Sequence, residues 1–498
     1  MANKIYFTMF LCLCCFFNAN AQVWPKYYGL PNSKERAKDI IEAYDKGYLI
    51  LGSYPQFSWL IKTDINGNVL WEKIIDNYPR EAATAQAIEV TADGGILLCG
   101  MALSGFSNKN CPFVMKLNAC GEKEWCKIFE GSPNAFPVAN DIKETESGDI
   151  VLLVNHFGSI PQETIHLFKL DAEGEVIWKK AYATTYNHIG SGIKQGSRLI
   201  ITAQNEYLVS GYGYWKHPWN PGGPVYIRPL YIMVESNGYE KWVLPVGLSD
   251  TTYGRGKSSY QIDIDRFVGV ADKWLSSTVT TSQLLLINFD GDLLKNVVID
   301  NESISPDITK GVPVYIEFLE DKAVLGGLYG NQTHGFATEI LLDSAIFSNI
   351  TIIEQIQHTN TGDIYNLSKS NSNKLVNQSN YYHSTIDSDI FLAKLNLNLE
   401  YDTAYTIPIT YDSLCTSGAP QSGFIYLNDC AIDIDLPGDS NCDAIVSLND
   451  IVSSVAKILG GIPQPFCPQN ADANGDGVLN VVDVVETANI IVGRIGRY

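Results

Sequence analysis

Several features that mark other classes of protein are scarce or missing in this sequence of 498 residues. After residue 21, no apolar run approaches the roughly 18 residues that a membrane-spanning helix needs, which predicts a chain without a membrane span. Lysine and arginine number 35 against 55 aspartates and glutamates, and the net charge of −20 argues against nucleic acid and anionic membranes as partners. Before residue 440, no sustained 3.6-residue apolar period occurs, so strands are expected there instead of helices.

Recognisable catalytic signatures are also missing. The sequence contains no nucleophile elbow, no phosphate-binding loop and no aspartate box of the neuraminidase type. The seven histidines follow no metal-ligand spacing, and a surface or loop position is the preferred interpretation for each of them: His156, His166, His188, His217, His334, His358 and His383. A carboxylate pair that forms only on folding is invisible in sequence, so these absences leave catalysis open.

The first 21 residues have the pattern of a secretory signal peptide. Lys4 gives a short basic start, residues 5–17 are apolar, and Ala19-Asn20-Ala21 is a small-x-small cleavage site. The mature chain is expected to begin at Gln22 and to be secreted. Three of the 11 cysteines lie in this segment, and the remaining eight are an even number that fits an oxidising compartment.

Proximity in the sequence suggests three disulfides among these eight cysteines. The expected pairs are Cys442 with Cys467, Cys99 with Cys111, and Cys415 with Cys430. The first would join two halves of the C-terminal region, the second would cross a hairpin, and the third would close a loop in a linker. Counting cysteines does not by itself determine their pairing.

Four segments of the sequence repeat one another: KTDINGNVLWEK (62–73), KLNACGEKEWCK (116–127), KLDAEGEVIWKK (169–180) and ESNGYEKWV (235–243). Each contains a glycine four residues before a tryptophan. The glycines are Gly67, Gly121, Gly174 and Gly238, and the tryptophans are Trp71, Trp125, Trp178 and Trp242. Weaker copies at 287–296, 340–349 and 394–403 continue the series with a period of about 53 residues, which makes seven units.

Each unit has the pattern of four short strands. In the second unit, AIEVTA, ILLCGMA, PFVMKLN and KEWCKIF are separated by turns or loops such as the one at Asp93-Gly94-Gly95. Four antiparallel strands that recur seven times are typical of a β-propeller, so residues 22–413 are predicted to form a mainly β, seven-bladed propeller. We expect the tryptophans to wedge between neighbouring blades.

The segment VWPKYYG (23–29) is similar to the last strand of a unit, although it precedes the first complete one. A last blade that lacks one strand could borrow this segment and so close the ring; the alternative is an ordinary strand of the first blade. LDAEGEVIW resembles the repeat of quinoprotein-like propellers, and DGGILLCG resembles repeats of secreted bacterial propellers. No residues beyond the repeat match a quinone site, so the resemblance implies the fold and not oxidation chemistry.

Two twelve-residue loops near the C-terminus have the spacing of calcium ligands. DSNCDAIVSLND (439–450) and DANGDGVLNVVD (472–483) place oxygen donors at positions 1, 3, 5, 9 and 12, with a backbone carbonyl at position 7. They predict two Ca²⁺ sites, formed by Asp439, Asn441, Asp443, Ile445, Ser447 and Asp450, and by Asp472, Asn474, Asp476, Val478, Asn480 and Asp483. Gly477 suits the sharp turn at position 6, whereas Ala444 at that position predicts weaker binding by the first loop.

After each loop the apolar spacing becomes helical, and the two apolar stripes are expected to pack against each other. They consist of Ile451, Val452, Val455, Ile458 and Leu459, and of Val484, Val485, Ala488, Ile491 and Val492. Residues 438–498 therefore resemble a type I dockerin, a duplicated calcium loop and helix with aspartate at position 12 where a standard EF-hand has glutamate. Residues 414–437 would form a linker.

The dockerin resemblance implies a secreted protein that docks onto a cohesin domain of a scaffold, often as a polysaccharide-degrading enzyme. The partner-reading positions of the family correspond here to Leu448-Asn449 and Val481-Val482. Many cohesin-binding dockerins have Ser-Thr there, whereas this chain offers apolar surface. The expected partner is therefore a cohesin-like protein with an apolar groove or, alternatively, the propeller of the same chain.

One stretch departs from the repeat. The fourth unit is longer than its neighbours, and the extra residues fall in YGYWKHPWNPGGPVY (212–226). There Tyr214, Trp215 and Trp219 could stack on the sugar rings of a glycan; the alternative is that they pack on a neighbouring blade.

Two functions remain open from the sequence. The preferred interpretation is a non-catalytic binding protein with a propeller platform and a calcium-stabilised docking module. The alternative is a glycoside hydrolase that its dockerin attaches to a scaffold. A carboxylate pair about 5 to 9.5 Å apart at the propeller axis would favour the hydrolase, and a funnel lined by hydroxyls and amides would favour binding.

Overall fold

The computed structural model describes residues 24–30, 33–54, 57–77, 83–105, 107, 109–130, 135–158, 164–182, 194–216, 225–248, 254–274, 280–299, 312–319, 322–329, 334–342, 350–357, 361–370, 374–384, 387–395, 401–402, 404–408, 415, 422–434, 437–441, 445–474 and 478–492. The predicted signal peptide, Trp219, Cys442, Asp443 and Asp476 lie outside the described residues. In the part of the chain that is described, no helix has the length and apolar character to cross a membrane.

Between residues 24 and 395 the described strands form seven sheets, and six of these contain four consecutive antiparallel strands. The first strands are β2 (Arg36–Glu42), β6 (Thr84–Val90), β10 (Ala135–Glu144), β14 (Lys194–Ile201), β18 (Gly256–Asp263), β22 (Val312–Leu319) and β26 (Thr361–Ser370). The second strands are β3 (Tyr48–Tyr54), β7 (Ile96–Leu103), β11 (Ile150–Gly158), β15 (Tyr207–Lys216), β19 (Arg266–Trp274), β23 (Lys322–Tyr329) and β27 (Lys374–Ser384).

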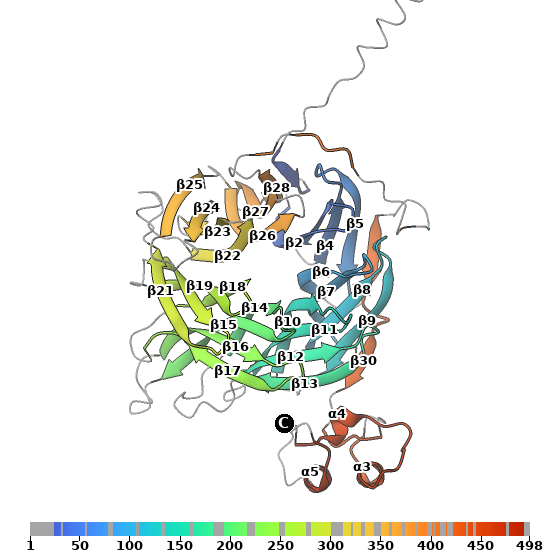
Figure 1. Cartoon of the computed structure of the whole chain (residues 1–498). Helices are drawn as coiled ribbons and strands as arrows, with labels where there is room; N and C mark the ends of the chain where they lie inside the picture. The colour runs from blue at the N-terminus through green and yellow to red at the C-terminus, as the bar shows by residue number, and fades with distance from the viewer. Residues whose placement is uncertain are drawn as a thin grey trace, which may run out of the picture.

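The outer half of each sheet repeats in the same way. The third strands are β4 (Phe57–Thr63), β8 (Asn110–Leu117), β12 (Thr164–Leu170), β16 (Val225–Val234), β20 (Thr280–Asn288), β24 (His334–Leu342) and β28 (Asp387–Leu395). The fourth strands are β5 (Val69–Asp76), β9 (Lys123–Glu130), β13 (Val176–Tyr182), β17 (Glu240–Pro245), β21 (Leu293–Ile299) and β25 (Ile350–Gln357). Each first strand contacts the first strand of the next sheet, and β26 contacts β2, so the sheets close into a β-propeller with the first strands nearest its centre (Figure 1).

An N-terminal strand, β1 (Lys26–Tyr28), completes the seventh sheet. It pairs antiparallel with β28, with Tyr27 opposite Phe391, and takes the place that the fourth strand has in the other sheets. The prediction that the last sheet borrows this strand is confirmed, and the alternative that it belongs to the first sheet is wrong. Both ends of the repeat region thus meet in one sheet, which closes the ring.

The repeated tryptophans lie between neighbouring sheets, as predicted. The ring of Trp71 occupies the space beside Gly121 where a β-carbon would stand, and Trp125 does the same beside Gly174. Both glycines have positive φ angles, 73° and 84°, which residues with a side chain rarely adopt. The same contact joins Trp178 to Gly238, Trp242 to Gly291 and, across the closure of the ring, Trp24 to Gly67.

The hydrophobic core lies between the sheets, because each sheet is covered on both faces. The strands of the sheets are therefore nearly continuous apolar runs. In β7, for example, Leu97 and Leu98 are both fully buried although they point to opposite faces of the sheet. Leu98 belongs to the apolar cluster between the first and second sheets, and Leu97 to the cluster between the second and third.

The same alternation explains why one predicted disulfide is wrong. Cys99 and Cys111 are buried, and neither forms a disulfide. Along the ladder of β7 and β8, Cys99 lies opposite Val114 while Cys111 lies opposite Ala102, so the two cysteines are offset by three residues. Three residues of strand span about 10 Å, which exceeds the reach of a disulfide, and the two side chains belong to different apolar clusters.

The segment predicted to be a linker, 414–437, packs along the rim of the propeller. β29 (Gly423–Tyr426) pairs parallel with β5, and β30 (Ala431–Ile434) pairs parallel with β9, so the first and second sheets each gain a fifth strand. Figure 1 shows β30 in orange along the outer side of β9. We call Cys415 together with residues 422–434 the strap.

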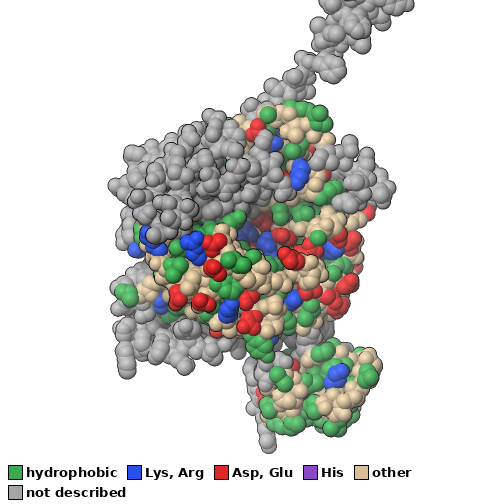
Figure 2. Space-filling model, in the orientation of Figure 1, with side chains coloured by type: hydrophobic (Ala, Val, Ile, Leu, Met, Phe, Trp, Pro, Cys, Tyr) green, Lys and Arg blue, Asp and Glu red, His purple; other side chains and the backbone are tan. Residues whose placement is uncertain are grey.

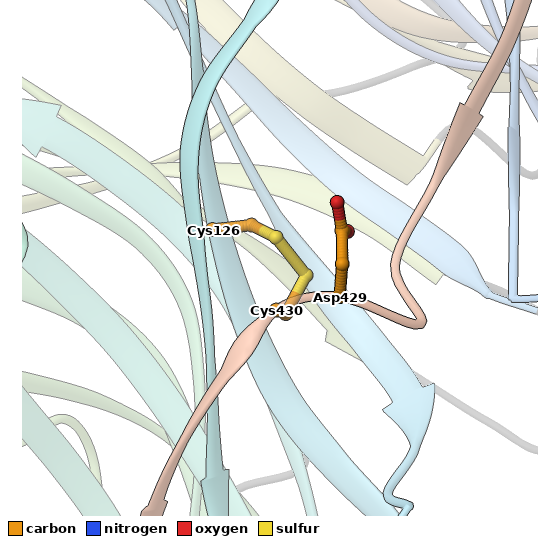
Figure 3. Close-up of side chains that lie close together, drawn as sticks. All are labelled: Cys126, Asp429 and Cys430. Carbon is orange, nitrogen blue, oxygen red and sulfur yellow. A yellow bond between two sulfur atoms is a disulfide. The ribbon is translucent and has the colours of Figure 1, made fainter.

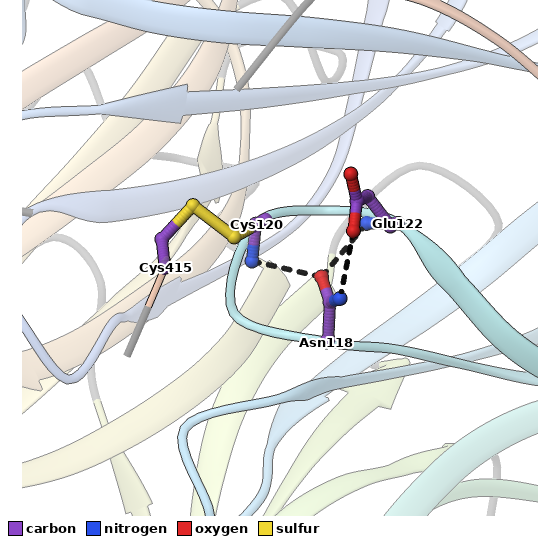
Figure 4. Close-up of a disulfide and its surroundings, with 4 residues drawn as sticks. All are labelled: Asn118, Cys120, Glu122 and Cys415. Carbon is purple, nitrogen blue, oxygen red and sulfur yellow. Dashed lines mark hydrogen bonds between the residues drawn. A yellow bond between two sulfur atoms is a disulfide. The ribbon is translucent and has the colours of Figure 1, made fainter. Parts of the chain in front are cut away.

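Two disulfides fasten the strap to the second sheet. Cys415 bonds to Cys120 in a turn between β8 and β9 (Figure 4), and Cys430 bonds to Cys126 in β9 (Figure 3). The prediction that Cys415 pairs with Cys430 is therefore wrong. The bonded cysteines are 295 and 304 residues apart in sequence, so their proximity depends on the closed ring and no local pattern could show it.

Ion pairs extend the attachment of the strap along the rim. Lys123 contacts the carboxylate of Asp429 and donates a hydrogen bond to the carbonyl of Tyr426 at 2.7 Å. Asp433 accepts a hydrogen bond from Lys179 of the third sheet, also at 2.7 Å. The strap thus contacts three consecutive sheets before the chain leaves the propeller.

The described residues from 437 to 492 form the C-terminal module. Its helices are α3 (Leu448–Ile458), α4 (Pro468–Ala471) and α5 (Val481–Ile491), and α3 contacts α5. Each of the two longer helices begins with a capping box, formed by Ser447 with Asp450 and by Asn480 with Asp483. Cys467 is disulfide-bonded, and its predicted partner, Cys442, lies outside the described residues.

The two helices do not bury all of their apolar side chains against each other, which corrects the expectation from sequence. Ile451 and Val484 are half-buried, whereas Val452, Val455, Leu459, Val485 and Val492 are exposed. The fully buried helix positions are the capping aspartates, Ser454 and Thr487. Small and polar residues therefore lie on the inner side of this module, and an apolar stripe faces outward.

Candidate functional site

The sequence left two alternatives open for the aromatic residues of the insertion, and the structure tests them most directly at Trp215. The side chain of Trp215 is only 2% exposed, packs in the core between the third and fourth sheets, and lies under the guanidinium of Arg228 at 5.0 Å. Trp215 is therefore not available for stacking on a ligand, and the alternative of packing within the propeller is confirmed for it. Tyr214 is half-buried, with its ring centroid 6.0 Å from that of Tyr212.

Four of the seven histidines lie on strands: His156, His166, His334 and His383. His188, His217 and His358 lie outside the described residues. His156 of β11 and His166 of β12 have ring centroids 5.1 Å apart. Burial, together with the smaller effects of His156 and Lys179, lowers the pKa of His166 to about 3. His166 is therefore neutral at physiological pH.

A different set of polar residues surrounds the propeller axis. In each of the seven sheets, the first strand carries a β-bulge, where the register with the second strand shifts by an extra residue. In the first five sheets the bulged residues are Lys38, Gln86, Asn140, Ser197 and Lys257, which we call the bulge ring. Each is half-buried and follows a buried alanine or glycine. Because the first strand is the innermost, its unpaired bulge residue lies next to the axis.

Immediately after the bulge, a buried ion-pair network crosses the axis. Arg198 of the fourth sheet lies 3.6 Å from Asp141 of the third sheet and 3.4 Å from Asp39 of the first sheet. The first and fourth sheets are not neighbours, so these side chains meet across the centre of the ring. Glu89 and Lys143 form a further ion pair two residues along their strands. We call these five residues the axial plug.

The aspartates of the axial plug also connect neighbouring sheets. Asp39 accepts a hydrogen bond from the backbone N–H of Ile88 at 2.9 Å, and Asp141 accepts one from that of Leu199 at 2.8 Å. Burial raises the pKa of Asp39, although Arg198 opposes the shift. Burial also disfavours the charge of Arg198, but Asp39 and Asp141 outweigh it and raise the pKa of Arg198. The network therefore connects the inner strands of the first four sheets to one another.

Neither the bulge ring nor the axial plug was predicted from the sequence. The signal is present, because RAKDI, TAQAI, VANDI and QGSRL share a small residue before a polar one at the same place in each unit. Recognising it requires the first strands to be aligned and the bulge to be known. The space-filling view shows basic and acidic side chains side by side in the hollow at the centre of the ring (Figure 2).

The two predicted calcium loops have the same internal geometry. In the first loop, the carboxylate of Asp450 accepts hydrogen bonds from the backbone N–H groups of Asn441 (3.0 Å) and Ser447 (2.7 Å). In the second, Asp483 accepts the corresponding bonds from Asn474 (3.2 Å) and Asn480 (2.8 Å). The residue at position 12 thus folds back onto positions 3 and 9 in both loops.

The described donors of these loops suit a hard divalent cation. Asp450 and Asp483 are fully buried, and Asp439 at position 1 of the first loop is 2% exposed. Buried carboxylates are costly unless a cation or hydrogen bonds compensate them, and Ca²⁺ prefers oxygen donors of this kind. The other described ligand positions that the sequence predicts are Asn441, Ile445, Ser447, Asp472, Asn474, Val478 and Asn480.

The predicted partner-reading positions lie on the surface of the C-terminal module. Leu448 is 70% exposed, Val481 65% and Val482 56%, and Asn449 is also exposed. Together with the exposed side chains of the outer stripe they form an apolar face on α3 and α5. We call Leu448, Val452, Leu459, Val481, Val482, Val485 and Val492 the apolar face.

One further cluster resembles a metal site but has another role. Cys126, Cys430 and Asp429 come together on the rim (Figure 3). Both sulfurs are joined in a disulfide, and Asp429 pairs with Lys123. These side chains therefore fasten the strap and are not ligands.

No family model matches this chain, and no curated protein matches it. Among solved structures, it is similar to a virginiamycin B lyase from Staphylococcus aureus, at 11% identity and a TM-score of 0.44 over 74% of this chain and 98% of that one. It is also similar to the polysaccharide lyase Uly1, at 10% identity and a TM-score of 0.44 over 73% and 90%. The β-propeller domain of the Trilobed protease from Pyrococcus furiosus matches at 11% identity and a TM-score of 0.39 over 72% and 95%. Likeness at this level carries no inference about activity.

Proposed function

We propose that this protein is a secreted binding protein. In this proposal each of the seven sheets is one blade of a seven-bladed platform, and the C-terminal module is a dockerin-like domain that binds two Ca²⁺ ions and docks the chain onto a protein partner. The observation that carries the docking function is the apolar face, because a folded module that buries serine and threonine while exposing leucine and valine is suited to a contact.

Calcium would supply charge neutralisation at the two loops. The first site would be formed by Asp439, Asn441, Asp443, Ile445, Ser447 and Asp450, and the second by Asp472, Asn474, Asp476, Val478, Asn480 and Asp483. Within the described residues, Asp450 and Asp483 hold their loops closed through backbone hydrogen bonds and begin the helices that carry the apolar face. Cation binding and presentation of the face would therefore be coupled.

Secretion is supported by two disulfides that close loops of 295 and 304 residues, since such bonds form and persist mainly in oxidising compartments. The strap that these disulfides hold gives the C-terminal module a fixed departure point on the rim. We infer that the proposed docking partner would receive the propeller in a defined orientation.

The partner we favour is a separate cohesin-like protein with an apolar groove. The alternative of docking onto the same chain is less well supported, because Leu448, Val481 and Val482 are exposed. The test is calcium-dependent binding of the full mature chain to a panel of cohesin domains, measured by surface plasmon resonance. Val481→Ser combined with Val482→Thr should weaken any binding found by about tenfold or more, because it removes apolar contact area at the centre of the face.

The matched control for that test is Ile177→Ser, which alters an exposed apolar residue on the propeller and should leave docking unchanged. Calcium affinity should also be nearly unchanged in the Val481 and Val482 variant, because neither side chain is a predicted ligand. Docking that improves with Ser-Thr at these positions would show that the module reads its partner by hydroxyl groups, and the apolar-face proposal would fail.

A polysaccharide-degrading enzyme is the second candidate. It is less well supported, because Asp39 and Asp141 at the axis are engaged by Arg198 and by backbone N–H groups. Amides and a hydroxyl contribute to the bulge ring, which favours binding over hydrolysis. Release of reducing ends from polysaccharides by the wild-type chain, abolished in Asp141→Asn with the fold retained, would establish the enzyme instead.

A further inference from the structure

The bulge ring and the axial plug are neighbours along the inner strands, and Arg198 of the axial plug reaches across the axis to Asp39. A ligand at the axis would meet the polar side chains of the bulge ring. The ring presents two ammonium groups, two amides and one hydroxyl: Lys38, Lys257, Gln86, Asn140 and Ser197.

Of the two lysines in the bulge ring, Lys38 is the one that forms no ion pair with a described residue. Among the described residues, its ammonium group donates one hydrogen bond, to Oε1 of Gln86 at 3.3 Å, and has no carboxylate within ion-pair distance. The adjacent Asp39 points away from it, toward Arg198 and the N–H of Ile88. Burial lowers the pKa of Lys38, and the neighbouring Arg36 lowers it further. An anionic ligand would stabilise a half-buried ammonium group that lies beside an arginine.

Other members of the bulge ring have hydrogen-bonding capacity to spare. The side-chain Oδ1 of Asn140 is buried and has no hydrogen-bond partner among the described residues. An amide can present either its oxygen or its NH₂ group to a ligand by rotation. Lys257 lies 3.6 Å from Asp272, a separation that leaves its ammonium hydrogens available to a second acceptor. The hydroxyl of Ser197 donates a hydrogen bond to the carbonyl of Gly256 at 2.8 Å, so its oxygen can still accept a hydrogen bond from a ligand.

We propose that the bulge ring binds one anionic group, the carboxylate or sulfate of an acidic saccharide, with Lys38 as its ion-pair partner and the side chains of Asn140 and Gln86 as hydrogen-bonding groups. This inference rests on the proposed binding function of the propeller and names its ligand class. An anion at this place would compensate Lys38 and could accept a hydrogen bond from the NH₂ group of Asn140 after rotation of the amide. A neutral sugar could use the amides but would leave the ammonium charge uncompensated.

The test is isothermal titration calorimetry of the full mature chain at low ionic strength, with glucuronate, glucose and inorganic sulfate as separate probes. At least one of the two anions should bind, and glucose should bind about tenfold more weakly or not at all. Stronger binding of glucuronate identifies a sugar carboxylate as the ligand group, and stronger binding of sulfate identifies a sulfate ester.

Two variants separate the proposed site from a general effect of charge. Lys38→Gln should weaken anion binding by about tenfold or more, because it removes the charge-assisted hydrogen bond. Gln86→Glu should weaken it at least as much, because a carboxylate within reach of Lys38 would take the place of the ligand. The second variant should keep or raise the melting temperature, so loss of binding could not be attributed to unfolding. Lys457→Gln removes a charge from α3 and should leave binding unchanged.

Anion binding that Lys38→Gln and Gln86→Glu both leave intact would overturn the proposal, as would the failure of both anions to bind. These outcomes are distinguishable from failure of the proposed docking function. Docking depends on the apolar face and is measured with cohesin domains, whereas the anion titration depends on the inner strands.

Discussion

The propeller and the C-terminal module arrange their residues in opposite ways. In the propeller, Leu97 and Leu98 are buried on both faces of a strand, and even Trp71 is fully enclosed. In the module, Asp450, Asp483 and Thr487 are buried while Leu448, Leu459 and Val481 are exposed. A ring of sheets obtains its stability from apolar area removed from water, because each sheet is covered by two neighbours. A module built on the helices α3 and α5 cannot bury that much apolar area. Its stability must therefore depend on its two loops.

The strongest way to sharpen that comparison is to remove divalent cations. We expect a chelator to abolish the unfolding transition of the C-terminal module, because carboxylates in both loops would then repel one another, while the transition of the propeller stays in place. Differential scanning calorimetry of the full chain checks this. The matched variant Asp483→Ala should lose the module transition even in excess Ca²⁺. A module that keeps its helix content in the chelator would refute the calcium assignment.

The second prediction concerns the disulfides of the strap. Replacing both Cys126 and Cys430 by alanine should lower the free energy of unfolding of the propeller by about 2 to 5 kcal/mol, because the disulfide closes a loop of 304 residues. Urea unfolding followed by tryptophan fluorescence measures the change. Reduction of the wild-type protein should produce a larger loss, because it also breaks the disulfide between Cys120 and Cys415.

The control for this experiment is Cys99→Ala, which removes a free thiol from the same sheet and should cost only about 1 kcal/mol. If the strap were held mainly by β29 and β30 and not by sulfur, the double variant would unfold at the same urea concentration as the wild type.

The third prediction tests the contact between tryptophan and glycine with a matched pair of glycines. Gly174 and Gly148 have nearly the same φ, 84° and 85°, but Gly174 faces the ring of Trp125 whereas Gly148 faces open space. Gly148→Ala should cost about 1 to 2 kcal/mol for the left-handed backbone alone. Gly174→Ala should cost about 1 to 3 kcal/mol more, because its methyl group would collide with the indole. Equal losses in chemical denaturation would mean that the indole moves aside freely.

The smallest expected effect is a pH dependence at one turn of the second sheet. Partial burial opposes the charge of Asp93, but hydrogen bonds from Lys116, Thr91 and the N–H of Gly95 outweigh it and lower its pKa to about 2. A lowered carboxyl pKa stabilises the fold above its ordinary value of 3.8, and this contribution disappears as the pH falls toward 2. Asp93→Asn should therefore cost less than about 1 kcal/mol at neutral pH, since the group is largely exposed.

The measurement for Asp93→Asn is the difference in unfolding free energy from wild type between neutral pH and about pH 3. The difference should shrink as the acid protonates the carboxyl of the wild type. A difference that is constant over this range would show that the hydrogen bonds to Asp93 matter and its charge does not.

Predictions from the sequence succeeded where a pattern repeats and failed where single residues must find distant partners. The glycine and tryptophan spacing correctly predicted that Trp71 and Trp125 lie between sheets, because the same contact recurs in each unit. The segment 23–29 was correctly predicted to supply a strand to the last sheet, because it resembles the fourth strands. For Trp215 the sequence left two alternatives open, since an aromatic residue in an insertion has the same sequence signature whether it is buried or exposed.

The sequence by itself determined the repeating strands, the placement of the tryptophans between sheets and the duplicated loops that precede α3 and α5. These features follow from turn residues, alternation and capping within a few tens of residues, so local composition is enough to encode them. Only the tertiary structure decided that Cys120 bonds to Cys415, that Arg198 meets Asp39 across the axis and that Lys38 lies beside Gln86. Each of these pairs joins residues of different sheets or of a sheet and the strap, and the packing of the sheets into a ring brings them together. Contacts of that kind depend on the summed geometry of all the sheets, which no local stretch of sequence contains.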